Sequence, residues 1–232
     1  QQGSQIIAAS HSEVVLNEAA DRDIVVAFVG KPHRIDDRGS QVRKALKSIG
    51  FDQYYLAEQV GWVLYLEGST DLAILRAWAR LLNHAAGESL SKPFVHYVGN
   101  QPRQVDDHFF GLREAKPDLV GVAIFVRLDR ELPKLGVRAL TWERREIENY
   151  LIQPDTLGSF ARQEDNRPLL AEARVAAMQG VISDLVPPIA LRDSAHPWWT
   201  TVKASTEFLD PLFAEYYRRQ SLPNLMAKSD YH

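Results

Sequence analysis

Two carboxylates flank the point where an apolar run of the sequence gives way to a helical pattern. The run Trp62–Leu66 is followed by Glu67-Gly68-Ser69-Thr70-Asp71, and apolar residues then recur with helical spacing up to Leu82. Ligands of parallel α/β sheets bind at the carboxyl ends of the strands, which is where Glu67 stands. A carboxylate that ends a buried strand needs a partner, and a hard cation such as Mg²⁺ is one.

Asp71 also has an interpretation that needs no ligand. It falls in the first turn of the expected helix, where the helix dipole favours an anion. Gly68 is expected to allow a tight turn with unusual backbone angles, and Thr70 to cap the helix. For Asp71 taken alone, this structural interpretation is the stronger one. No comparable structural role explains Glu67.

A second acidic position follows the most apolar segment of the chain, Leu119–Val126. Asp129 comes just after this segment and could face the same crevice as Glu67. It could equally be a loop aspartate that pairs with Arg127 or Arg130. The residues alone do not separate these two interpretations.

The elements expected around these residues alternate between strand and helix. The nearly unbroken apolar run at 119–126 is typical of a central parallel strand covered on both faces. Beyond Pro154 the pattern becomes helical and is punctuated by prolines. We therefore predict an α/β fold, a parallel sheet flanked by helices and followed by a mainly helical C-terminal region. Strands are expected at 5–10, 23–29, 62–66, 94–98, 119–126 and 137–141, and helices at 13–20, 41–49 (with Gly50 as its C-terminal cap), 70–82 and 103–115.

The composition limits the classes of protein to consider. The chain has 232 residues, of which 45% are hydrophobic and 25% charged, as in soluble globular proteins of one large or two small domains. The net charge of −3 provides no general attraction to nucleic acid. The absence of cysteine excludes disulfides and thiol metal sites, and fits a cytoplasmic location. No apolar run reaches membrane-spanning length, and the missing initial methionine indicates a piece of a longer protein.

The motif at the end of the first core strand resembles a known domain. A strand ending in Glu-Gly, an aspartate four residues after the glutamate, and a later apolar strand followed by acids resemble the Toprim domain of topoisomerases, primases and some nucleases. The segment "TWERREIENYL" at 141–151 is similar to the Toprim of OLD-family (overcoming lysogenisation defect) nucleases, which are linked to ATPases. The resemblance covers about 61–151. It implies Mg²⁺ or Mn²⁺ held by Glu67, Asp71, Asp129 and Glu148.

Glu148 matches the most recurrent acid of the family motif, and its alternative role is that of an acid at a helix N-terminus. Glu146 and Glu148 would share one face of a strand but not of a helix. One carboxylate that the resemblance implies is absent. Toprim domains usually carry Asp-x-Asp after the third strand, and the first position falls here on Arg127, or on Val126 in an Asp-x-x-Asp variant.

Three explanations of the missing acid stay open. The position could carry an engineered substitution, or the chain could be a degenerate nuclease. Alternatively, the site could be rearranged so that Asp129, Glu131 or Glu148 compensates. Two-metal phosphodiester chemistry needs acids for both cations, so the loss should weaken at least one metal position.

OLD-family nucleases also use a late lysine, which stabilises the transition-state phosphate. Lys203 is the best match and Lys228 the second, while a solvated surface lysine is the alternative for each. The aromatic residues that surround Lys203 are expected to pack helices rather than to stack on bases. They are Trp198, Trp199, Phe208, Phe213, Tyr216 and Tyr217.

The first 30 residues resemble the end of an ABC-type ATPase domain. His11 matches the switch histidine that senses the γ-phosphate across a dimer interface, although it could instead cap the following helix. The resemblance implies ATP and homo-oligomerisation through the ATPase domain in the full-length protein. The chain has no G-x-x-x-x-G-K-[ST] loop, so it is not expected to bind ATP by itself. The expected organisation is an ATPase end at 1–30, a linker at 31–60, a Toprim core at 61–151 and a helical region at 152–232 that completes the site.

The leading hypothesis is therefore a metal-dependent DNA endonuclease domain of an ATPase-coupled nuclease, acting in defence against phage or foreign DNA. Glu67 would serve as a metal ligand and general acid/base, and Lys203 would offset the developing negative charge. The alternative is a catalytically degenerate Toprim that binds nucleic acid or a partner protein. A small-molecule phosphotransferase ranks last because the nucleotide-binding loop is missing.

Overall fold

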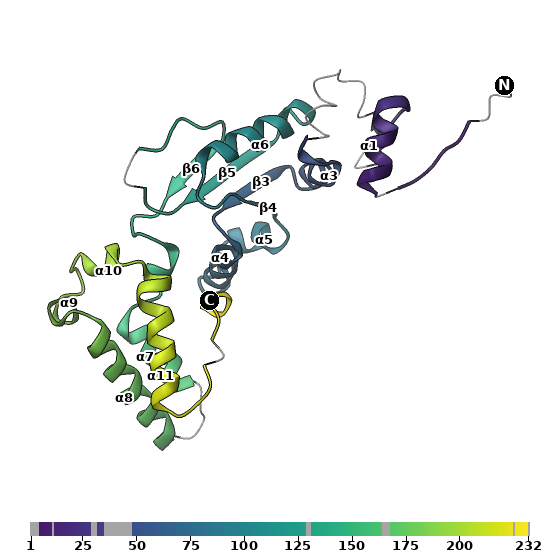
Figure 1. Cartoon of the computed structure of the whole chain (residues 1–232). Coiled ribbons are helices and arrows are strands. Elements are labelled where there is room, and N and C mark those ends of the chain that lie inside the picture. Colours follow the sequence, from purple (N-terminus) through teal and green to yellow (C-terminus); the bar gives the residue numbers. More distant parts are fainter. Residues whose placement is uncertain are drawn as a thin grey trace. The chain divides into compact units, whose positions relative to one another are not determined.

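The fold is described from a computed structural model of the chain (Figure 1). It describes residues 5–10, 12–28, 32–34, 48–128, 131–163, 168–224 and 226–231. The strands are β1 Val26–Ala27, β2 His33–Arg34, β3 Trp62–Leu66, β4 Phe94–Tyr97, β5 Val120–Phe125 and β6 Arg138–Thr141. The helices are α1 Glu13–Arg22, α3 Phe51–Val60, α4 Ser69–Leu81, α5 Ala86–Ser91, α6 Pro102–Ala115, α7 Pro154–Gln163, α8 Pro168–Leu185, α9 Pro188–Arg192, α10 Trp198–Thr201 and α11 Asp210–Arg219. Shorter turns are the 3₁₀-helices η2 Ile147–Tyr150 and η4 Lys228–Asp230, and the π-helix η3 Ala204–Leu209.

A parallel sheet with strand order β4-β3-β5-β6 forms the α/β part of the fold. Strands β3 and β5 pair with Trp62 opposite Val120 and Tyr65 opposite Ala123. Helix α4 follows β3, and α6 connects β4 to β5 (Figure 1). The prediction of a parallel sheet flanked by helices, with a helical C-terminal region, is confirmed.

Gly121 allows helix α6 to approach strand β5 closely. A Cβ atom at this position would lie 2.8 Å from the ring of Phe109 and 2.3 Å from Cγ1 of Val137. Phe109 is only 2% exposed, so its ring has little room to move. The small residue therefore sets the separation between the helix and the sheet.

The chain divides into two compact units, described here one at a time. Unit 1 comprises residues 1–65, 92–123 and 133–139, and unit 2 comprises 66–91, 124–132 and 140–232. In unit 1, a small core forms where α3 packs near β1. Its buried residues are Val25, Ala27, Phe51, Tyr54 and Ala115.

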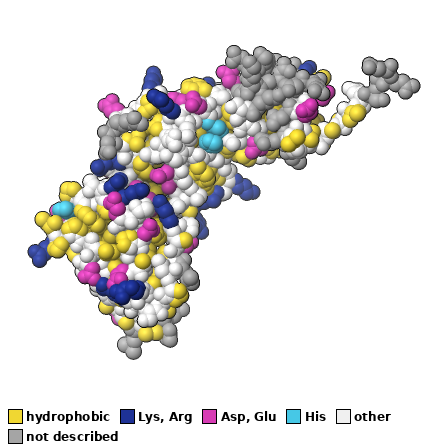
Figure 2. Space-filling model, viewed as in Figure 1, with side chains coloured by type: hydrophobic (Ala, Val, Ile, Leu, Met, Phe, Trp, Pro, Cys, Tyr) yellow, Lys and Arg dark blue, Asp and Glu magenta, His cyan; other side chains and the backbone are white. Residues whose placement is uncertain are grey.

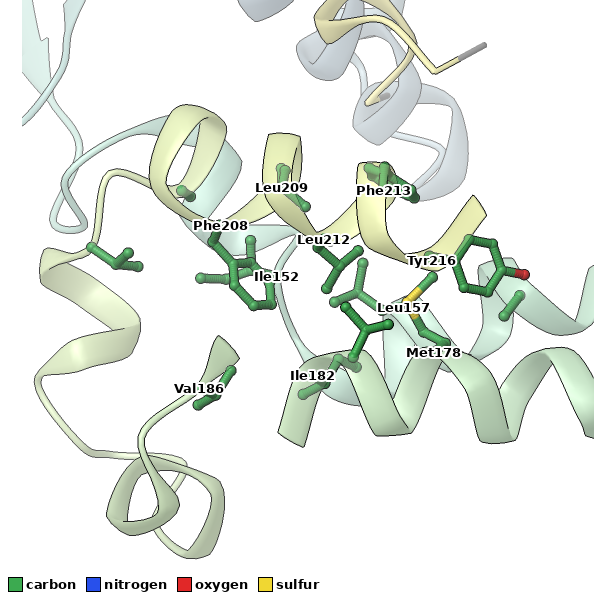
Figure 3. Packing of buried hydrophobic residues seen from close by; sticks show 14 of the residues in the cluster. Ile152, Leu157, Met178, Ile182, Val186, Phe208, Leu209, Leu212, Phe213 and Tyr216 are labelled. Atoms are coloured by element: carbon green, nitrogen blue, oxygen red, sulfur yellow. The ribbon is translucent and has the colours of Figure 1, made fainter. Parts of the chain in front are cut away.

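The larger core lies in unit 2, where helices α7, α8 and α11 pack together. Figure 3 shows Met178 and Ile182 of α8, Leu212 and Tyr216 of α11 and Leu157 of α7 packed together in this core, each at most 4% exposed. The aromatic residues expected to pack helices do so. Trp199, Phe208, Phe213 and Tyr216 are buried in this core, and Trp198 and Tyr217 pack against it.

The structure differs from the sequence prediction in the first 60 residues. Residues 5–10 do not form a strand, and Ile6 and Ile7 are 87% and 92% exposed. A strand needs a partner for its backbone groups, which apolar composition alone does not provide. Residues 51–60, assigned to a linker, form α3 instead. Gly50, with φ of 103°, precedes α3 and directly follows helical residues at 48–49, as predicted for a cap, while residues 41–47 of the predicted helix lie outside the described residues.

Acidic and basic side chains are interspersed over the face shown in Figure 2, in keeping with the small net charge of −3. Within the described parts of the chain, every helix is too short or too polar to cross a lipid bilayer.

Candidate functional site

The junction between β3 and α4 is closed by a hydrogen bond between its two acidic residues. The backbone N–H of Glu67 donates to Oδ2 of Asp71 over 3.3 Å. The side chain of Asp71 is buried, at 8% exposed, whereas Glu67 is exposed. Asp71 therefore has a structural role as well as a charge that burial makes costly.

Two expectations about this junction are wrong. Gly68 has φ of −156° and ψ of 179°, an extended conformation that any residue adopts, and a Cβ atom there would meet nothing within 4 Å. Helix α4 begins at Ser69 with Gly68 as its N-cap residue, so Thr70 lies inside the first turn. The turn follows from the Asp71–Glu67 hydrogen bond rather than from the conformational freedom of glycine.

The second acidic element is η2, which is fixed by hydrogen bonds to a distant part of unit 2. Asn149 is fully buried, and its Nδ2 donates to the carbonyl oxygens of Trp199 and Val202 at 3.1 and 2.9 Å. Its Oδ1 accepts the backbone N–H of Glu146 at 2.9 Å. Asn149 thus satisfies three backbone groups and determines where the turn lies.

Glu146 and Glu148 have different surroundings, although both are buried. Glu146 precedes the first turn of η2, and its Oε2 accepts the backbone N–H and the hydroxyl of Ser205 at 3.1 and 2.9 Å. Glu148, only 4% exposed, lies 4.0 Å from Nζ of Lys228 through its Oε1. Glu146 is therefore held to the π-helix by two hydrogen bonds, while Glu148 faces the half-exposed ammonium group of Lys228.

Burial and like charges perturb the two buried acids, Asp71 and Glu148. Burial and then the charge of Glu67 raise the pKa of Asp71 from 3.8 to about 6. Burial is also the main cause that raises the pKa of Glu148 from 4.5 to about 7, with the charges of Glu146 and Asp71 adding to it. Lys228 lowers both pKa values. Glu67, Asp71 and Glu148 therefore belong to one electrostatically coupled group.

The structure places the ammonium group of Lys228, the second-ranked lysine, beside this group. Lys203, the first-ranked one, is partly buried, and its backbone N–H donates to Oε2 of Glu207 over 2.9 Å just before the π-helix. The sequence provides no signal that favours Lys228, because the position of this lysine depends on how the last segment of the chain packs. That segment forms the 3₁₀-helix η4, which begins at Lys228 and contacts α4.

The end of β5 lacks the acid that the resemblance implies at Val126 or Arg127. Arg127 is exposed, and its Nη1 donates to the carbonyl oxygen of Glu143 over 3.4 Å. Glu131 and Arg127 help to line an open hollow of about 420 Å³ at this end of the strand. Asp129 and His11 lie outside the described residues.

Unit 1 contains a separate buried polar group that the sequence analysis did not identify. The hydroxyl of Tyr65 donates to Nδ1 of His108 at 2.9 Å, and Nε2–H of His108 donates to Oε1 of Gln53 at 2.7 Å. The rings of His96 and His108 stack with centroids 3.8 Å apart. Burial and the neighbouring His96 lower the pKa of His108 from 6.5 to about 3, so it is neutral at physiological pH.

The donor set of the acidic group suits a hard cation, since Asp71 and Glu148 offer carboxylate oxygens at a place where their charges repel one another. In the described residues, no three acids or histidines converge closely enough to form a complete metal site. Comparison of the chain with protein-family models, with curated proteins and with solved structures found no match.

Proposed function

We propose that this chain is a metal-dependent DNA endonuclease of the Toprim type, which hydrolyses phosphodiester bonds as part of an ATPase-coupled protein. The observation that carries the proposal is the electrostatic coupling of the buried Asp71 and Glu148, from α4 and η2, in unit 2. Buried like charges are costly unless a cation neutralises them. The choice of DNA as the substrate rests on the resemblance of the strand-end and 141–151 motifs.

Asp71 and Glu148 would hold the metal ion, with Glu67 beside them and Asp129 as a further ligand. A divalent cation bound there supplies Lewis acidity to a phosphoryl oxygen and lowers the pKa of a bound water. Glu146 and Asn149 orient the turn that carries Glu148, so they act as positioning residues.

Glu148 would serve as a metal ligand, because a bound cation would favour the ionised form of this buried carboxyl group, whose pKa burial otherwise raises to about 7. Glu67, exposed beside the ligands, would act as the general acid/base. Lys228, 4.0 Å from Glu148, offers the positive charge that a developing phosphorane needs. Lys203 would act in the same sense from the start of the π-helix.

Plasmid nicking tests this function directly. The purified chain should convert supercoiled plasmid to nicked circles with Mg²⁺ or Mn²⁺ and not with EDTA. Glu148→Gln and Asp71→Asn should reduce the rate by at least about 100-fold, as expected for loss of a group that acts in the transition state. Glu172→Gln is the matched control, since Glu172 is an exposed partner of Arg162 at 3.4 Å.

One observation favours a second candidate, a non-catalytic Toprim that binds nucleic acid or a protein. The position implied for an acid carries the exposed Arg127, which would repel a cation and attract a phosphate. A chain that binds plasmid in a salt-dependent way but never nicks it, with either metal, would establish this candidate and exclude the first.

A further inference from the structure

The two elements that carry the buried acids also carry aromatic rings. On α4, Trp78 follows Asp71 by seven residues, so both lie on one helix face about 10 Å apart along the axis. On η2, Tyr150 follows Glu148 by two residues. The rings of Trp78 and Tyr150 meet edge to face with centroids 5.9 Å apart. Within unit 2, each of the two elements therefore carries one buried acid and one aromatic ring.

Trp142 and Arg144 complete this group, which we call the aromatic platform (Trp78, Trp142, Tyr150 and Arg144). The ring of Trp142 lies 6.2 Å from that of Trp78 and 5.7 Å from that of Tyr150. The guanidinium carbon of Arg144 lies 4.7 Å from the centroid of Tyr150, and its Nη1 donates to the carbonyl oxygen of Asn149 over 2.6 Å. All four side chains are partly exposed. The three rings meet at interplanar angles of 60° to 88°, so the platform combines partly exposed ring faces in different orientations with a fixed positive charge.

We propose that the aromatic platform binds unpaired bases of single-stranded DNA next to the phosphodiester that is cleaved. The proposal rests on the proposed function, because it takes the acids of unit 2 as the cleavage centre. Aromatic rings stack on bases of any sequence, and an arginine plane can stack on a base or contact a phosphate.

Two features favour a single strand over other occupants. The platform carries a cation, and the exposed Arg127 belongs to the same unit, which suits a polyanion rather than an apolar peptide. Bases of an intact duplex are already stacked inside the helix and cannot reach the rings, so the platform should select single-stranded or flapped DNA.

Binding can be measured without cleavage, by fluorescence anisotropy in EDTA with a labelled 15-nucleotide oligo-dT and a labelled 15-base-pair duplex. Trp142→Leu and Tyr150→Leu should each weaken oligo-dT binding about 5- to 100-fold, the range expected from base–aromatic stacking, with little effect on the duplex. Tyr150→Phe keeps the ring and should bind within about twofold of the wild type. Tyr55→Leu, which removes an exposed tyrosine of unit 1, is the control.

Arg144→Lys keeps the charge and the three rings but loses the planar stack and the hydrogen bond to Asn149, so it tests the proposal even where a ring variant fails to fold. It should weaken oligo-dT binding at least about threefold, while binding to the duplex changes by less than about twofold. Ring variants that melt lower yet bind oligo-dT as tightly as the wild type, or a wild type that prefers duplex, would overturn the proposal.

The same variants assayed for nicking with Mg²⁺ distinguish the two proposals. A chain that nicks plasmid, but whose binding is insensitive to the rings, retains the endonuclease function and excludes the platform. A chain that binds oligo-dT through the rings but never nicks retains the platform as a binding surface and excludes the endonuclease.

Discussion

Glu148 is a buried carboxyl group whose protonation is linked to folding. Its pKa is raised from 4.5 to about 7 in the folded chain, so stability falls as the pH rises from 4.5 through 7. At 1.36 kcal/mol per pKa unit, the ionised group costs about 3 kcal/mol at pH 8. In EDTA, Glu148→Gln should therefore melt higher than the wild type at pH 8 and equally near pH 4.5. Thermal denaturation followed by circular dichroism measures this difference.

Glu172→Gln should melt like the wild type at both pH values, because Glu172 is exposed and its pairing with Arg162 is screened by water. Addition of Mg²⁺ should raise the melting temperature of the wild type and not that of Glu148→Gln, since only the wild type keeps both acids for the ion. If Glu148→Gln melted lower at pH 8, the pair with Lys228 would outweigh the cost of burial.

The two candidate lysines can be compared at matched substitutions. Lys228→Gln removes a charge that lowers the pKa of both Asp71 and Glu148, so those pKa values should rise further and the pH profile of nicking should shift upward. We expect nicking at pH 7 to fall, because a smaller fraction of the two carboxyl groups is then ionised and able to hold a cation. Lys203→Gln should leave the pH profile in place even if it lowers the rate. If Lys203→Gln shifted the pH profile and Lys228→Gln did not, Lys203 would be the lysine that lowers the pKa of the buried acids.

At the scale of elements, the position of η2 depends on one buried asparagine. Asn149→Asp keeps the shape and Oδ1 but removes the donor that serves the carbonyl oxygens of Trp199 and Val202. Two buried acceptors and a new buried charge should together destabilise unit 2 by about 3 kcal/mol or more. Urea denaturation at pH 7 measures the loss. A change below about 0.5 kcal/mol would mean that the turn is held by other contacts.

The contact between α6 and β5 depends on the absence of a side chain at Gly121. Gly121→Ala places a methyl group within 3.0 Å of Phe109 and Val137, and should destabilise unit 1 by about 1–3 kcal/mol through overpacking. Gly158→Ala is the matched control, because a Cβ atom there meets nothing within 4 Å and the residue lies inside α7. This control should be neutral or stabilising. Equal effects of the two substitutions would contradict the close approach.

The strands between 62 and 141 and the helices α4 and α6 are predictable from the sequence because each has a strong period bounded by polar residues, whereas the short helix α5 was not expected. The run at 119–126 and the helical spacing of 70–82 fit β5 and α4 within two residues. Weak patterns fail before this region, in the first 60 residues. Helix α3 has a mixed composition, and its burial is decided by its neighbours rather than by its own periodicity.

The candidate site is less predictable than the fold, because its contacts depend on tertiary packing rather than on local sequence patterns. Glu67 and Asp71 are four residues apart, so their proximity follows from local geometry. The contact of Glu146 with Ser205 joins residues 59 positions apart, and no local pattern encodes it. The role of Lys228 likewise depends on tertiary packing. Sequence reasoning therefore predicted a role for Glu148 but not the residues that hold its turn in place.

At the scale of the whole molecule, the two units should respond to acid in opposite directions. In unit 1 the pKa of His108 is lowered to about 3, so stability is complete above pH 6.5 and is lost as the pH falls. The loss reaches about 2 kcal/mol at pH 5. In unit 2 the raised pKa values of Asp71 and Glu148 mean that stability increases as the pH falls from 7 to 5.

Hydrogen exchange measured peptide by peptide at pH 7 and pH 5, after correction for intrinsic rates, should reveal this divergence. Opening free energies of peptides from α3 and α6 should decrease at pH 5, while those from α8 and α11 should increase. Replacing Asp71 and Glu148 together by Asn and Gln should abolish the change in unit 2 and leave that in unit 1. A uniform shift of both units would contradict the pKa assignments.

The hydrogen bonds from 146 and 149 to Ser205 and Val202 also determine when the acidic turn can form during synthesis. They close loops of 59 and 53 residues, which contain helices α7 to α10. An unstructured loop of this length costs about 3.6 kcal/mol in closure entropy beyond a constant, so these contacts form after the intervening helices have folded. A nascent chain that has not yet emerged beyond Ser205 therefore lacks the anchor of Glu146.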